Sequence, residues 1–66
     1  EKPNLTKREL EVLSAIVAGN PDRTIAKSLY ISEHTVRSHI KNLFKKLRVS
    51  SRAQAVAKAL QAKIIN

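Results

Sequence analysis

Four helix-start signals are spread over this 66-residue chain, so its helices must be short and closely connected. Each signal consists of one or two residues that suit the N-terminus of a helix, through a side-chain cap or a fixed backbone angle. The four signals are Thr6 with Glu9, Asn20 with Pro21, Ser32, and Ser51 with Gln54. Strand signals are weak, because the chain has one Tyr, one Phe and no Asn-Gly or Asp-Gly turn. The pattern predicts an all-α fold, a four-helix bundle with a central helix-turn-helix.

The spacing of apolar residues sets the expected bounds of these helices. Asn20 should be the N-cap of the second helix with Pro21 at its first position, and Gly19 should close the first helix in a left-handed cap. The predicted helices cover about residues 7–18, 21–29, 33–47 and 52–63. The apolar stripe of the first helix consists of Leu10, Leu13, Ile16 and Val17.

Composition limits the class of protein to which this chain can belong. No apolar run exceeds four residues, so the sequence has no membrane span and no signal-peptide core. The lack of cysteine excludes a disulfide framework and favours a reducing compartment, and two histidines five residues apart do not make a zinc site. The formal net charge is +8, and residues 34–66 hold eight basic residues and no acidic one. A compact and strongly basic domain favours nucleic acid as its partner.

The expected third helix has two chemically different faces. At about 100° per residue, its apolar side chains gather on one side, namely Val36, Ile40, Leu43, Phe44 and Leu47. The opposite side carries only basic and small polar residues, namely His34, Arg37, Ser38, Lys41 and Lys45. Exposed helix faces usually mix Glu with Lys, because such pairs stabilise a helix. A face without acids suits a surface that meets phosphates and base edges, and the second helix of a helix-turn-helix enters the major groove.

Several segments together resemble the LuxR/NarL/FixJ-type DNA-binding domain. The resemblance extends over about residues 5–60 with the motif spacing intact. The segments are 5–13 (LTKRELEVL), Gly19, 25–26 (IA), 32–39 (SEHTVRSH), 46–47 (KL) and 51–56 (SRAQAV). This family resemblance implies four helices with a central helix-turn-helix, in the C-terminal output domain of a bacterial transcription regulator that dimerises on DNA through its last helix.

The resemblance also implies roles for individual residues. The residues expected to read bases are Arg37, Ser38, Lys41 and His34. The residues expected to contact the DNA backbone are Arg23, Thr35, His39, Asn42 and Lys45. By helical phase His39 borders the core, where we expect it to be half-buried with one nitrogen toward a phosphate. Thr35 has the alternative of a purely local hydrogen bond in the first helical turn.

The expected fourth helix has two usable faces. Ala55, Val56 and Ala59 lie on the face expected to pack against the domain itself. The resemblance assigns the other face to a homodimer on DNA, and its residues are Ala53, Ala57, Leu60, Gln61 and Ile64. Without the resemblance, an alanine-rich surface helix is the simpler interpretation. We expect the domain to be mostly monomeric in solution and to dimerise on DNA.

The sequence departs from the family pattern in three places. Residues 20–24 (NPDRT) replace a Leu followed by a polar Asn-Lys-Glu run, and the acidic Asp22 would be repelled by a phosphate backbone. Arg48 stands where the family usually has Gly in a left-handed cap, a conformation that costs a non-glycine residue about 1 kcal/mol. Ser38 occupies a position that varies widely among relatives, so no base preference follows from it.

Other functional classes fit the sequence less well. A promoter-reading sigma-factor region shares the Arg8-Glu9-x-x-Val12-Leu13 pattern, but the segment 49–52 and the helix after it favour the LuxR type. A module that binds an acidic protein, or a basic helix on a membrane, would use the same charge. An enzyme is disfavoured, because no carboxylate pair, nucleophile–base pair or glycine-rich phosphate loop is present.

The remaining expectations concern context. Residues 1–4 are predicted to be a linker remnant and residues 5–66 the DNA-binding domain, since a chain without Met suggests part of a longer protein. Double-stranded DNA and a second copy of the chain are the expected partners, and RNA polymerase is a further candidate. We expect no cofactor, metal, small-molecule ligand, membrane partner or catalytic residue, and a location at the bacterial nucleoid in the cytoplasm.

Overall fold

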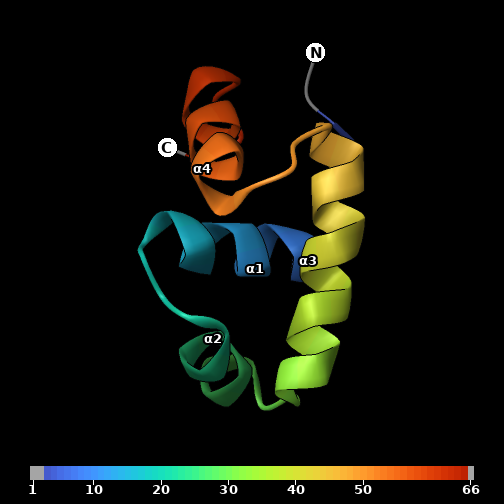
Figure 1. Ribbon diagram of the computed structural model, residues 1–66, viewed down its shortest axis with the longest axis vertical. Helices are drawn as coiled ribbons and strands as arrows, with labels where there is room; N and C mark the ends of the chain where they lie inside the picture. The colour runs from blue at the N-terminus through green and yellow to red at the C-terminus, as the bar shows by residue number, and fades with distance from the viewer. Residues whose placement is uncertain (1–2, 66) are drawn as a thin grey trace.

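The computed structural model describes residues 3–65, and these residues form four helices and no strand. The helices are α1 (Lys7–Val17), α2 (Asp22–Leu29), α3 (Glu33–Leu47) and α4 (Arg52–Gln61). Figure 1 shows α1 across the middle of the molecule, α3 along one side, and α2 and α4 at opposite ends. Both α1 and α2 pack against α3, and α4 packs mainly against α1. The predicted all-α fold with its helix-turn-helix at α2 and α3 is confirmed.

One hydrophobic core joins all four helices. Its buried members are Val12, Leu13, Ile16, Ile25, Ala26, Val36, Leu43, Leu47, Ala55 and Ala59. Val12 is fully buried although the predicted apolar stripe of α1 did not contain it, whereas Leu10 from that stripe is only half-buried. The reason is that α1 contacts α3 and α4 together, so its buried face is wider than a single stripe.

The N-terminus of α1 is closed by the predicted capping box. The Glu9 amide donates to Oγ1 of Thr6 at 3.1 Å, and the Thr6 amide donates to Oε1 of Glu9 at 2.9 Å. Two backbone donors that lack a helical partner are thereby satisfied.

The connection from α1 to α2 differs from the prediction by one residue. Asn20 was expected to cap α2, but its backbone amide and its side-chain amide both donate to the carbonyl of Ala15, at 3.0 and 3.2 Å. Asn20 therefore completes the end of α1, after Gly19 turns the chain with φ +90° as predicted. Pro21 is the N-cap of α2 and makes no side-chain hydrogen bond, so the helix begins at Asp22.

The two ends of α4 also correct the prediction. Ser51 Oγ accepts from the Gln54 amide at 3.1 Å, but the Gln54 side chain accepts from Ser50 rather than from the Ser51 amide, so the second capping box is only half formed. The helix ends at Gln61 instead of continuing to residue 63. Lys63 has φ 55°, and this left-handed turn brings the following residues back against the core.

Candidate nucleic-acid interface

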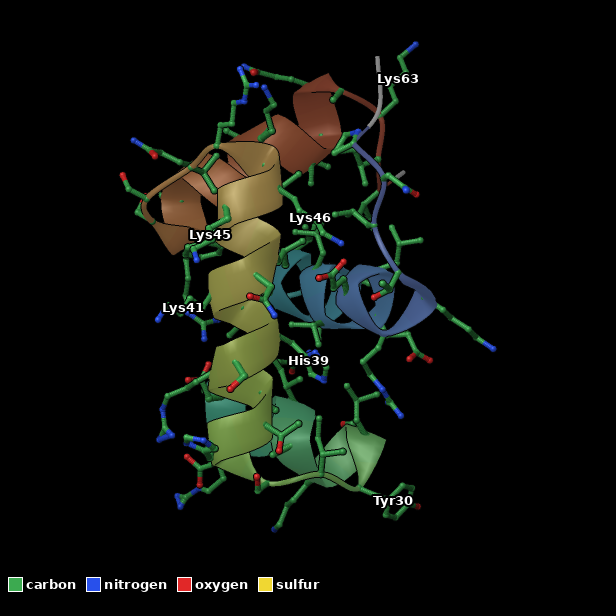
Figure 2. The ribbon with its side chains drawn as sticks, turned by 90° about the vertical axis from the view of Figure 1, so that its right-hand side faces the viewer. Tyr30, His39, Lys41, Lys45, Lys46 and Lys63 are labelled. Atoms are coloured by element: carbon green, nitrogen blue, oxygen red, sulfur yellow. The ribbon has the colours of Figure 1, made fainter. Side chains whose placement is uncertain are left out.

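The exposed side of α3 is the most distinctive surface of the described residues. Ser32 caps the helix by accepting from the Thr35 amide at 3.0 Å, and three buried residues (Val36, Leu43 and Leu47) fix its rotation. The predicted base readers all remain exposed on the opposite side, namely His34, Arg37, Ser38 and Lys41. Figure 2 shows Lys41 and Lys45 projecting from the same edge of α3, away from α1.

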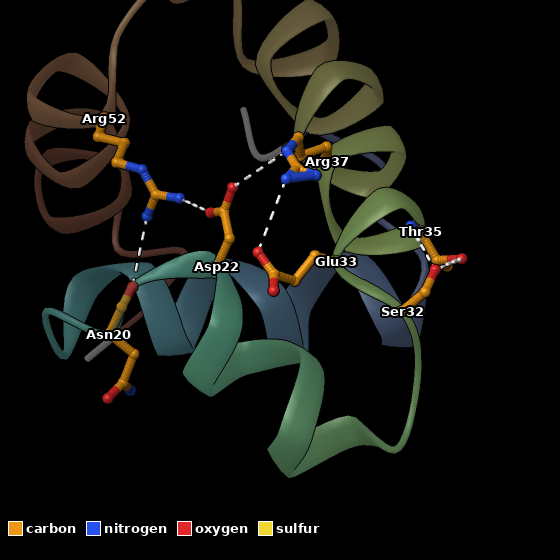
Figure 3. Close-up of polar contacts among 7 residues, drawn as sticks. All are labelled: Asn20, Asp22, Ser32, Glu33, Thr35, Arg37 and Arg52. Carbon is orange, nitrogen blue, oxygen red and sulfur yellow. Dashed lines mark hydrogen bonds and ion pairs between the residues drawn. The ribbon is translucent and has the colours of Figure 1, made fainter.

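The predicted backbone-contacting residues occupy three different environments. Arg23, Asn42 and Lys45 are exposed. His39 is half-buried, as expected from its helical phase, and lies on the α1 side of α3 (Figure 2). Thr35 is also half-buried, and its hydroxyl is 2.9 Å from the hydroxyl of Ser32, so it takes part in the local cap (Figure 3). The structure thus brings together the α3 residues on one helix and leaves Arg23 on the neighbouring α2.

Lys46 points away from this exposed surface. Its Nζ donates to Oε1 of Glu9 at 2.8 Å, and the Glu9 side chain is 6% exposed. The hydrogen bond from Lys46 holds the pKa of Glu9 below its ordinary value of 4.5, the Thr6 amide lowers it further, and burial opposes both. This pair was not predicted from sequence, because the capping box already accounts for an acid at position 9.

Asp22 connects three helices at the flank of this surface. Oδ1 of Asp22 accepts from Nη2 of Arg52 at the start of α4, and Oδ2 lies 3.9 Å from Nε of Arg37 (Figure 3). Nη2 of Arg37 lies 3.6 Å from Oε1 of Glu33, one helical turn earlier. Arg52 also donates to the carbonyl of Asn20 at 3.4 Å. The two arginines neutralise the acid that sequence analysis expected to repel DNA.

The expected dimer face on α4 divides into two parts. Ala53, Ala57, Leu60 and Gln61 are exposed on the helix, and about half of the Leu60 surface is accessible. Ile64 lies beyond the end of α4 and packs partly against the domain's own core, so it does not continue the helical face.

Comparisons with known proteins agree with this geometry. Residues 3–59 match the GerE family, described as bacterial regulatory proteins of the luxR family. The chain belongs to this luxR family. Its members are DNA-binding transcription regulators rather than enzymes, and the predicted resemblance is confirmed.

Two curated relatives illustrate the range of the family. The chain is 50% identical over 60 residues to the spore germination protein GerE of Bacillus subtilis, with 91% of this chain and 81% of GerE covered. It is 42% identical over 64 residues to the probable transcriptional regulatory protein NarL of Mycobacterium tuberculosis, with 97% and 30% covered. The chain thus spans most of GerE and less than a third of the larger regulator.

Two solved structures have the same fold as this chain. The structure of GerE superposes with a TM-score of 0.85 and 40% identity, covering 94% of this chain and 92% of GerE. The response regulator ChrA of a heme-sensing two-component system superposes with a TM-score of 0.90 and 35% identity, covering 98% of this chain and 32% of ChrA.

Residues 3–65 contain no group of three His, Cys, Asp or Glu residues that could hold a metal ion. None of the helices within that range is long and apolar enough to cross a membrane.

Proposed function

We propose that this luxR-family domain binds double-stranded DNA sequence-specifically, with α3 in the major groove, as the output domain of a transcription regulator. The observation that carries the proposal is the exposed side of α3, which presents basic and small polar side chains over several turns. A helix of 15 residues is about 22 Å long and fits a groove about 12 Å wide.

The side chains of this surface suit two kinds of contact. Arg37 and Lys41 can donate to O6 and N7 of guanine, while Ser38 and His34 can bond to more than one base edge. Contacts to phosphates and sugars would orient the domain without reading the sequence. The residues proposed to make them are Lys45, Asn42, Thr35, His39 and Arg23.

A homodimer on DNA is the second part of the proposal. The exposed part of α4 offers Ala53, Ala57, Leu60 and Gln61 to a second copy, with Ile64 at its border. Small side chains permit close approach of two helices, but the apolar area is modest, so we expect pairing to depend on two adjacent DNA half-sites. RNA polymerase stays a candidate partner, for which the family assignment is the only support.

Salt dependence of duplex binding tests the proposal. A domain that neutralises several phosphates should lose affinity steeply as salt rises, with a linear relation between the logarithms of the affinity and of the salt concentration. Two duplexes serve as probes: one of random sequence, and one that the chain enriches from a random pool (the enriched duplex). Fluorescence anisotropy should measure the affinity for each at a series of salt concentrations. An affinity that does not change between low and physiological salt would contradict DNA binding through this surface.

Two single variants separate base reading from phosphate contact. Arg37→Ala should weaken binding to the enriched duplex by about 1–3 kcal/mol and reduce the preference over random DNA. Lys45→Ala should weaken binding to both duplexes by a similar factor. It should also reduce the slope of the logarithm of the affinity against the logarithm of the salt concentration by about one. Equal losses on both duplexes for Arg37→Ala would exclude its role as a base reader.

A further inference from the structure

We infer that Asp22 is a positioning residue for Arg37, and that it fixes the direction in which α3 presents this guanidinium to DNA. The inference rests on the proposed reading of bases by Arg37. It assigns a function to a residue of the segment where this chain departs from the family pattern, with NPDRT at residues 20–24.

The Asp22 carboxylate is held in place by the residues around it. Asp22 is the first residue of α2, so its backbone is part of a helix that packs against α3. Its side chain is only 25% exposed, and Arg52 of α4 holds the other carboxylate oxygen. An aspartate has a short side chain with two χ angles, so an anchored Oδ1 leaves little freedom for Oδ2.

The two acids beside Arg37 approach different parts of its guanidinium. Asp22 is closest to Nε, the nitrogen nearest the aliphatic chain, at 3.9 Å. Glu33 is closest to Nη2, one of the two terminal nitrogens, at 3.6 Å. An end-on contact with O6 and N7 of guanine uses the two terminal nitrogens. The Asp22 contact is therefore compatible with base reading, whereas the Glu33 contact competes with it.

The environments of the two acids support this difference. The Glu33 side chain is 46% exposed, and no other cation contacts its carboxylate among the described ion pairs. The second partner of Asp22 is Arg52 on α4, and Figure 3 shows Arg52 on the opposite side of the Asp22 carboxylate from Arg37. Glu33 can turn into solvent when DNA approaches, while Asp22 stays and orients the arginine.

Charge-matched variants test the inference. Asp22→Asn and Glu33→Gln each remove one negative charge near Arg37, so general electrostatics would strengthen DNA binding equally in both. The probes are the duplex that the unaltered chain enriches from a random pool and a shuffled duplex of the same composition. Their affinities are compared at fixed salt, with thermal denaturation as the check on folding.

We expect Asp22→Asn to lower the ratio of enriched to shuffled affinity by roughly three- to tenfold. Glu33→Gln should leave that ratio unchanged or raise it. In an Arg37→Ala background the effect of Asp22→Asn on the ratio should disappear, because Asp22 acts through that side chain.

The contrary results are distinct from failure of the proposed function. Suppose that Arg37→Ala lowers the ratio of enriched to shuffled affinity. The positioning role is then wrong if Asp22→Asn leaves that ratio unchanged or raises it. It is also wrong if Asp22→Asn lowers the ratio by the same factor in the Arg37→Ala background. If Arg37→Ala itself leaves the ratio unchanged, base reading by Arg37 and the inference both fail.

Discussion

At the scale of single residues, this domain depends on charged side chains that bridge helices. Glu9 of α1 receives a hydrogen bond from Lys46 of α3, and Asp22 of α2 lies between arginines of α3 and α4. The first pair is partly buried and close, so we expect it to stabilise the fold. The second is more exposed, so its stabilising effect is small and its geometric effect on Arg37 is more important.

The Glu9 pair predicts a pH dependence of stability. A carboxylate whose pKa is lowered by folding stabilises the protein above its unfolded pKa, and this contribution is lost as the pH falls through the folded pKa. Glu9 should therefore contribute fully at neutral pH and progressively less below its ordinary value of 4.5. Glu9→Gln, which keeps an oxygen for the capping box, should reduce the free energy of unfolding by about 1–3 kcal/mol at pH 7. Urea denaturation at a series of pH values measures this difference.

A matched control for Glu9 lies on the same helix. Glu11 is exposed, and among residues 3–65 its ion-pair partner is Arg8, at 3.4 Å and three residues apart. Glu11→Gln should therefore change the free energy of unfolding by less than about 0.5 kcal/mol. The Glu9→Gln deficit should shrink as the solution is acidified. A deficit that stays constant from neutral to strongly acidic pH would show that lost charge is not its cause.

The residue contacts that sequence predicts here are local ones. The hydrogen bonds of Thr6 with Glu9 and of Ser32 with Thr35 join residues three apart on one helix start, so their spacing indicates them. Lys46 is 37 residues from Glu9, and its phase on α3 does not show which residue it meets. Such partners follow only from how the helices pack, which is why the Asp22 contacts were also absent from the sequence-based site.

At the scale of helices, backbone conformation determines where each helix stops. Each of the four helices is followed by a residue with positive φ, namely Gly19, Tyr30, Arg48 and Lys63 in chain order. The Gly19 and Arg48 caps were predicted from the residue type and from the family pattern. The left-handed turn at Lys63 was not, because a lysine gives no sign of positive φ. The predicted α4 was consequently two residues too long.

Two substitutions at these caps should have effects of opposite sign. A Cβ at Gly19 would meet no atom of residues 3–65 within 4 Å, so Gly19→Ala tests backbone strain at φ +90° and should lower the free energy of unfolding by about 1 kcal/mol. Arg48→Gly removes a side chain from φ 58° and should stabilise by up to about 1 kcal/mol. Chemical denaturation at high salt, where surface charge is screened, measures the change in the free energy of unfolding for each variant. Changes of the same sign would contradict the assignment of strain to these two positions.

At the scale of the whole molecule, the basic charge is concentrated in the half of the chain that carries the proposed DNA-binding surface. The basic surplus comes entirely from residues 34–66, which form most of α3, its exit and α4. Within the described structure, the acids lie on α1, α2 and the first turn of α3, and four of the ion pairs involve Glu9, Asp22 or Glu33. In the proposed complex, a long-range field of this kind would orient the domain before its side chains meet bases.

In the proposed complex, α3 reads a base sequence and α4 pairs two copies of the chain on it. Selection from a random duplex pool tests this most directly, with the unaltered chain and with Ala57→Glu, which places a charge on the exposed face of α4. We predict that the unaltered chain enriches two half-sites about one helical turn apart. Ala57→Glu should enrich the same half-site singly. A pool with no enriched sequence after repeated rounds with the unaltered chain would contradict sequence-specific DNA binding by this domain.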